Sequence, residues 1–362
     1  MVRSSDGHLS VDSRSLSSST VDIPPHPLAH PPSPPMTIQH PNSFTARMSP
    51  LDKVLVPPQT LTPDASPRCQ GGQNEPPRNV AQFSTDVLQN SEKGHMERDF
   101  ANENGPEHVP FVLACESQVL AQQLTLIEMA ALSEVDWRDL VEMKWSNASQ
   151  TIRSWVQFLY VEDRKGIDLV VGRFNLMVKW VCSEIVLTSD LHERARTLIK
   201  FIHTAVHARR ISNYATMLQI AIALSSSDCT RLHRTWELVP AEDKRLFKDM
   251  ECLIQPVRNF HDLRVEMETA NLQEGCIPFI GLYVHDLTYN AQKPAQVIGN
   301  EGSLLVNFER YRTAARIVKS LLRLIDASTK YRFEPVQGII ERCLWVASLS
   351  EDEIQARSRQ LE

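Results

Sequence analysis

The segment CIPFIGLYVHDLTY, residues 276–289, carries large apolar side chains on nearly every side of a helical projection. Proline stands near its start, where a helix tolerates it because the missing N–H has no intrahelical partner there. The stripe suited to packing on a domain consists of Ile280, Tyr283, Val284 and Leu287. A second face, small and polar, consists of Gly281, His285, Thr288 and Gln292. Glycine there permits close backbone approach. Periodicity alone favours a buried core helix over one that presents this second face to a partner.

Aromatic residues and prolines divide the chain into two parts. All six Trp and all six Tyr lie after Val109, whereas sixteen of the 22 prolines lie at or before Pro106. A segment without Trp or Tyr and rich in Pro, Ser, His and Asn buries too little apolar surface to offset its chain entropy. The sequence therefore predicts a disordered tail over residues 1–108 and a single folded domain over residues 109–362, long enough for a substantial core.

The folded part has the periodicity of helices. In residues 194–210 the apolar residues follow the i, i+3, i+4, i+7 pattern and the charges fall on the opposite face. Residues 213–224 are apolar nearly all round, which predicts a central buried helix with Asn213 as its N-cap. Three further helices are predicted over 117–132, 307–326 and 350–362. Sustained period-2 alternation is missing, so the predicted fold class is all-α.

Composition and motifs argue against several functional classes. The net charge of −6 gives no reason to propose nucleic-acid binding, and seven scattered cysteines suit a reducing compartment. The sequence offers no signal peptide, no apolar run near the ~18–20 residues that span a bilayer, and no phosphate-binding or nucleophile motif. His203 and His207 are spaced to share a metal, but no acidic or Cys ligand is in register, so two polar-edge histidines are favoured. We expect no cofactor, no metal and a cytoplasmic location. Any activity would come from binding and deforming another molecule.

The tail contains PPHPLAHPPSPP at residues 24–35, with overlapping P-x-x-P spacing. Such a segment forms a polyproline helix that SH3-type domains bind, so an SH3-type partner is one interpretation. The matches are frequent in proline-rich sequences, and an unstructured leader is the favoured alternative.

Several blocks of the sequence occur in one order at defined spacing. They are LAQQLTLIE (120–128), FNLMVKWVCSEIV (174–186), FIHTAVHARRISNYATMLQIAIAL (201–224), RLHRTWELVP (231–240), CIPFIGLYVHDLTY (276–289), LVNFERYRTAARIV (305–318) and LSEDEIQARSRQLE (349–362). Together they resemble the catalytic domain of Ras-family guanine nucleotide exchange factors, the Cdc25-homology domain. The resemblance covers roughly residues 110–362.

This resemblance implies a single large helical bowl from which a helical hairpin, about residues 276–318, protrudes. In the family the hairpin levers the first switch of a Ras-type GTPase aside and speeds GDP release, and no bond is made or broken. The implied partner is a Ras-like small GTPase of the Ras, Rap or Ral class. Because such GTPases are usually lipidated, the protein is expected to reach membranes only through partners.

Site residues follow from the resemblance, position by position. The hairpin residues that match switch-facing positions are His285, Thr288 and Gln292, with Tyr289 beside them. The residues that match other GTPase-facing positions are Gln122, Asn175, Arg234 and Thr313, with Asn175 directed at the second switch and Gly281 on the small face of the hairpin. The residues that match positions bracing the base of the hairpin are Arg209, Asn213 and Tyr214.

The sequence also departs from the family pattern. Gln292 stands where several relatives carry a Glu that helps empty the phosphate and Mg²⁺ site, and an amide keeps the hydrogen-bonding shape without the charge. Gln122 and Thr313 replace an Arg and a Lys seen in some members. Residues 1–108 do not resemble the helical module that usually precedes this domain. These departures support an alternative, a GTPase-binding scaffold that has lost exchange activity. A third hypothesis, an unrelated helical interaction protein, is disfavoured.

Overall fold

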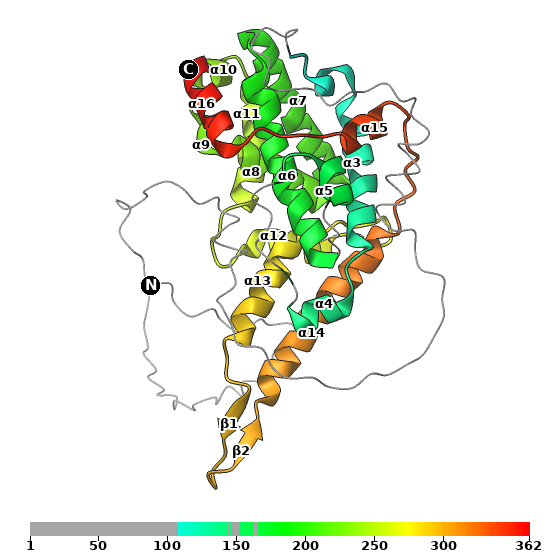
Figure 1. Cartoon of the computed structure of the whole chain (residues 1–362), viewed down its shortest axis with the longest axis vertical. Coiled ribbons are helices and arrows are strands. Elements are labelled where there is room, and N and C mark those ends of the chain that lie inside the picture. Colours follow the sequence, from blue (N-terminus) through cyan, green and yellow to red (C-terminus); the bar gives the residue numbers. More distant parts are fainter. Residues whose placement is uncertain (1–107, 144, 146–151, 162–165) are drawn as a thin grey trace, which may run out of the picture. The chain divides into compact units, whose positions relative to one another are not determined.

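The computed structural model describes residues 108–143, 145, 152–161 and 166–362 (Figure 1). The predictions of a disordered tail and of an SH3-binding motif at residues 24–35 concern residues outside this described part. Among the described residues, His108 already contacts the domain, with its Nε2 atom 3.3 Å from Oε2 of Glu184.

Helices make up most of the described part, which confirms the predicted all-α fold class. The helices before the hairpin are η1 Phe111–Ala114, α3 Ser117–Leu132, α4 Trp137–Glu142, α5 Trp155–Val161, α6 Gly166–Leu187, α7 Leu191–Arg210, α8 Tyr214–Leu224, α9 Ser227–Thr230, α10 His233–Glu237, α11 Ala241–Leu253 and α12 His261–Thr269. The hairpin and the C-terminal part contain α13 Ile280–Ala291, β1 Gln296–Ile298, β2 Leu304–Val306, α14 Phe308–Ser328, α15 Ile339–Leu344 and α16 Glu351–Leu361.

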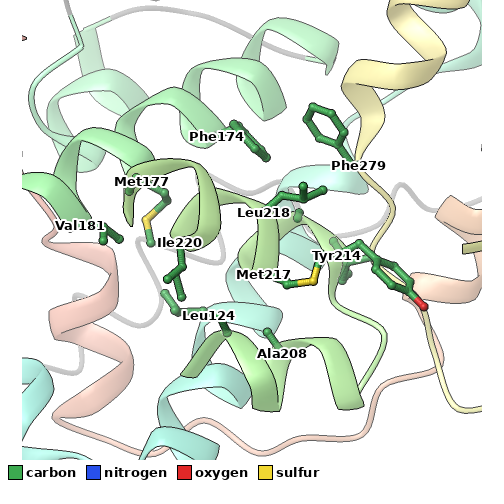
Figure 2. Close-up of a cluster of buried hydrophobic side chains, with 14 of the residues drawn as sticks. Leu124, Phe174, Met177, Val181, Ala208, Tyr214, Met217, Leu218, Ile220 and Phe279 are labelled. Atoms are coloured by element: carbon green, nitrogen blue, oxygen red, sulfur yellow. The ribbon is translucent and has the colours of Figure 1, made fainter. Parts of the chain in front are cut away.

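Helix α8 is the central helix that its apolar sequence predicts. It packs against α3, α6 and α7, and nearly all of its residues are buried. Figure 2 shows Met217, Leu218 and Ile220 of α8 among side chains from α3 and α6. A helix that is apolar all round can be buried on every side, and in α8 every residue except the partly buried Ile222 is buried.

The start of α8 confirms Asn213 as an N-cap. Its Oδ1 atom accepts a hydrogen bond from the Thr216 backbone N–H at 2.9 Å. The same side chain donates from Nδ2 to Oγ1 of Thr125 on α3, at 2.7 Å, and Asn213 is fully buried. One side chain therefore ends a turn, starts a helix and joins that helix to α3.

Helices α13 and α14 pack along one another and form a hairpin that extends from the helical body, with β1 and β2 at its far end (Figure 1). The inner stripe of α13 is buried as predicted. Its members are Ile280, Tyr283, Val284 and Leu287. Helix α14 continues to Ser328, beyond residue 318, and its C-terminal half buries Leu321 and Leu324 against the domain.

The two strands were not predicted from the sequence. They pair antiparallel, with Val297 opposite Leu305, and the connecting turn contains Gly302 at φ +75°. Three residues per strand are too few for an alternating pattern to be recognised, because one buried face needs several repeats to show.

The buried cap predicts unequal effects of two N-cap substitutions. Asn213→Ala should lower the free energy of unfolding by about 2–4 kcal/mol, because it removes the cap and leaves buried polar groups on α3 and α8 without a partner. Ser350→Ala, which removes the cap of the surface helix α16, should lower it by about 1 kcal/mol. Urea denaturation of the full chain measures both values, and equal losses would contradict the role given to the Thr125 contact.

Candidate functional site

The base of the hairpin is joined to the turn between α7 and α8. The Tyr214 N–H donates to the Ile277 carbonyl at 2.9 Å, and the Ile277 N–H donates to the Ser212 carbonyl at 3.0 Å. These two bonds form a short parallel bridge immediately before α13. After α14, the Tyr331 hydroxyl donates to the Ile211 carbonyl at 2.5 Å. The chain therefore enters and leaves the hairpin at the same turn.

Helix α12 is fixed to this turn by side chains. The Arg209 guanidinium makes two hydrogen bonds of 2.7 Å to the Glu266 carboxylate, and this partner raises the Arg209 pKa. The Tyr214 hydroxyl donates to the Glu266 carbonyl at 3.2 Å. Burial, together with the Glu266 charge, raises the pKa of Tyr214 to about 12, so the hydroxyl keeps its proton as a donor. The three residues assigned to the base of the hairpin therefore lie in or beside the turn that holds it: Arg209, Asn213 and Tyr214.

The outer face of α13 carries the four residues assigned to the switches. The His285 side chain is 43% exposed, and Tyr289 is 49% exposed. Thr288 is half-buried, and its Oγ1 atom donates to the Val284 carbonyl at 2.9 Å. Gln292 is exposed and is the C-cap of α13. Spacings of three, four and seven residues place these side chains on one face, so the structure brings them together on the surface.

Gly281 lies elsewhere. It is buried, and a Cβ atom at this position would stand 2.6 Å from the ring of Phe279. That ring packs against Phe174 of α6 with centroids 5.0 Å apart, as Figure 2 shows. The close approach that glycine permits is therefore made by an aromatic ring of the same chain.

Asn175 and Thr313 lie on the two helices that flank α13. Asn175 follows Phe174 on α6, which packs against α13, and its side chain is half-buried. Thr313 on α14 donates from Oγ1 to Oε1 of Glu309 at 3.3 Å. The Asn290 side chain joins the two hairpin helices by donating to the Arg310 carbonyl at 2.8 Å. Asn175 and Thr313 therefore lie on helices that contact α13.

Arg234 is not part of this surface. It lies on α10, which packs beside α7 at the end of the helical body away from α13 and α14 (Figure 1). Its backbone N–H donates to Oε2 of Glu362 at 2.6 Å, so α10 is held by the C-terminal helix. Gln122 lies on α3 and is half-buried. The next residue, Gln123, is buried and binds the backbone at Glu334 and Val336.

The end of the hairpin exposes large apolar side chains that were not predicted as site residues. We call them the hairpin tip: Val297, Ile298, Leu304, Leu305, Val306 and Phe308. Ile298 is 77% exposed and Phe308 is 71% exposed. Exposed apolar patches of this kind mark interaction surfaces. The signal in the sequence was a pair of short apolar runs on either side of a glycine-containing turn.

The histidine pair considered as a metal site has another neighbour. His203 Nε2 lies 2.7 Å from Oδ1 of Asp243 on α11, a contact between helices that spacing along one helix does not reveal. In the described part of the chain, groups of three or more His, Cys, Asp or Glu side chains that could hold a metal ion are absent. Within those same ranges, every helix is too short or too polar to cross a bilayer.

Several guanine nucleotide exchange factors are similar to this chain in sequence. The guanine nucleotide exchange factor LTE1 of Candida glabrata is 40% identical over 253 residues, which are 70% of this chain and 19% of that protein. LTE1 of Saccharomyces cerevisiae is 34% identical over 256 residues, 70% of this chain and 18% of that protein. Ras guanine nucleotide exchange factor Y of Dictyostelium discoideum is 28% identical over 257 residues, 71% of this chain and 16% of that protein. The chain thus spans less than a fifth of the length of these relatives.

A family-level comparison agrees with these relatives. The profile of the RasGEF domain matches residues 119–312, which run from the start of α3 into the first turns of α14. The match covers more than half of the chain. It includes the turn between α7 and α8, helix α12 and the outer face of α13. The chain therefore belongs to the RasGEF domain family.

Proposed function

We propose that this protein is a guanine nucleotide exchange factor that promotes GDP release from a Ras-like small GTPase of the Ras, Rap or Ral class. The exchange domain spans residues 109–362, and the hairpin at about 276–318 inserts beside the switch regions of the GTPase. The observation that carries the proposal is the exposed polar face of α13 on a helix whose opposite face is buried. Family membership and the names of the relatives support it.

Exchange needs only differential binding. If the hairpin binds the nucleotide-free GTPase more tightly than the GDP-bound form, it must weaken GDP binding by the same factor, because coupling between two ligands is reciprocal. An acceleration of ~10⁴-fold requires ~5.5 kcal/mol of barrier lowering. A desolvated interface with a few aromatic anchors supplies a difference of that size.

The residues divide this work by position. His285 and Thr288 would displace the first switch, and Tyr289 would provide an aromatic contact at the rim. Gln292, at the end of α13, would offer an amide to the site that Mg²⁺ and phosphate leave. Asn175 on α6 and Thr313 on α14 would contact the GTPase on either side of α13. The protein would reach membranes through the lipidated GTPase.

A GTPase-binding scaffold without exchange activity is the alternative. Gln292 and Thr313 are neutral at positions where the family resemblance implies a charged residue in some members, and the Thr313 hydroxyl is already bonded to Glu309. Neutral groups bind a surface well but give less stabilisation to a site that has lost a cation and a phosphate.

A release assay separates the two. The full chain, added in excess to Ras, Rap and Ral proteins loaded with fluorescent GDP, should accelerate release from at least one of them by about 10³–10⁵-fold, since the barrier is lowered by about 4–7 kcal/mol. Titration by light scattering or calorimetry reports complex formation in parallel. A stable complex without faster release would select the scaffold, and neither complex nor release would reject both.

A single hairpin substitution tests the assigned face. Thr288→Arg should lower the GDP-release rate at least about hundredfold, because a long charged side chain keeps the switch from the helix, a loss of about 2.7 kcal/mol. Unfolding free energy should change by less than about 1 kcal/mol at this partly exposed position. The matched control is Thr230→Arg, since Thr230 on α9 also bonds the carbonyl four residues before it and lies away from the hairpin. Equal GDP-release rates of the two variants would contradict the assignment of the outer face of α13 as the GTPase-binding surface.

A further inference from the structure

Three residues join the middle of α13 to α12, and we call them the hairpin clasp: Asn259, Arg264 and Asp286. The Arg264 guanidinium binds the Asp286 carboxylate through two bonds, Nη1 to Oδ2 at 2.8 Å and Nη2 to Oδ1 at 3.0 Å. Asn259 donates from Nδ2 to Oδ1 of Asp286 at 3.4 Å, and its carbonyl accepts from Nε of Arg264 at 2.9 Å. The three groups therefore close a ring of hydrogen bonds between the two helices.

The clasp is largely shielded from water. The side chains of Arg264 and Asp286 are 14% and 22% exposed. Burial alone would raise the pKa of Asp286, but the neighbouring His285 and the Arg264 charge outweigh it, and the pKa lies below the usual 3.8. The carboxylate is therefore ionised at neutral pH. A two-pronged pair between arginine and carboxylate fixes orientation as well as distance.

The loop that supplies Asn259 has an unusual backbone. Arg258, Asn259 and Phe260 have φ values of 49°, 57° and 56°, in the left-handed region that side chains disfavour. Consecutive residues stay in such a conformation only where surrounding contacts determine it. Asn259 contributes two of those contacts, one through its side chain and one through its carbonyl. The loop is thus shaped around the Arg264–Asp286 pair.

Two facts connect the clasp to the exposed face of α13. Asp286 directly follows His285, and Nδ1 of His285 lies 4.0 Å from Oδ1 of Asp286. Asp286 is also six residues, or about 9 Å, along the helix from Ile280, the first residue of α13. The bridge at Ile277 holds the beginning of the helix, and the buried stripe packs its inner face on the domain. Apolar packing is not directional, so it leaves the helix some freedom to rotate and tilt. A second, oriented attachment further along the helix removes that freedom.

We propose that Asp286 is a positioning residue: through Arg264 and Asn259 it sets the angle and rotation of α13 on α12, and so keeps His285 and Thr288 directed at the partner. This inference rests on the proposed exchange function for its effect on rate, but its structural part does not. Loss of the carboxylate should free the hairpin to move about its base while the core beneath it stays folded.

The structural part is tested without a GTPase. Nitroxide labels on Cys252, which is exposed on α11, and on a Ser303→Cys substitution in the hairpin turn report the distance from body to hairpin end, in the full chain with Cys69→Ser. In Asp286→Ala the distance distribution from pulsed electron–electron double resonance should widen to at least about twice the wild-type width, since hinge motion is no longer opposed. Asp286→Asn keeps part of the hydrogen bonding, so its distance distribution should have a width between those of the wild type and Asp286→Ala.

The matched control is Glu242→Ala, which breaks a two-pronged pair with Arg245 on the surface of α11 and should leave the width unchanged. If Asp286→Ala does not fold, Asp286→Asn decides by the same measurement. If the variant that decides, Asp286→Ala or its substitute Asp286→Asn, has a distance distribution as narrow as that of the wild type, the clasp does not orient α13.

The effect on rate is measured separately. In GDP-release assays Asp286→Ala should lower kcat by about tenfold to a hundredfold with a smaller change in KM, because misplaced contacts cost the transition state more than the encounter. Wide distances with an unchanged kcat would overturn the positioning role. Wide distances in a protein whose wild type releases no GDP from any GTPase would leave the clasp supported and reject the proposed function.

Discussion

The backbone bridge between Ile277 and the turn before α8 is the constraint on which the hairpin depends. The turn can meet Ile277 because Ser212 adopts a left-handed conformation, with φ 57°, and Asn213 then caps α8 from a fully buried position. Helix α8 itself is enclosed by the other core helices, so the turn cannot move without the core. Through two backbone hydrogen bonds, the turn before the buried helix α8 fixes the start of α13.

The apolar stripe of α13 supplies the stability that its outer face does not. Each large apolar side chain buried there contributes about 1.5–3 kcal/mol, and Phe279 adds a ring contact with α6 just before the helix begins. Polar residues on the outer face remain hydrated and add little to folding. A surface that is already ordered before the partner arrives loses less entropy on binding, and so more of its contact energy is free to oppose nucleotide binding.

The sequence predicted those features that repeat along one element. The helix over 117–132, the Asn213 cap and the buried stripe of α13 each follow from spacing within a single segment. Contacts between segments were not predictable in this way. Arg264 and Asp286 stand 22 residues apart on different helices, and Asp243 reaches His203 from α11. Gly281 shows the same limit, because projection places it beside His285 while the ring of Phe279 covers it. The resemblance to exchange factors supplied the site residues, and it assigned Arg234 to a position outside the hairpin, where the structure also has it on α10.

Order in the hairpin must decrease toward its end. Asn307 is the last residue with several attachments: its side chain caps α14 and binds the Pro294 carbonyl, and its N–H donates to the Ala295 carbonyl. Beyond it, a two-stranded sheet exposes every residue of both strands, and such a sheet is marginally stable in water unless its apolar side is covered. The N-terminal part of α13 is therefore held by the core and the bridge, and its middle by the clasp, whereas β1 and β2 at the far end of the hairpin pair with each other. A partner that covered the tip would add stability at the end of the hairpin that has the fewest attachments. It would not alter the outer face of α13, because the bridge at Ile277 and the clasp already determine the orientation of that helix.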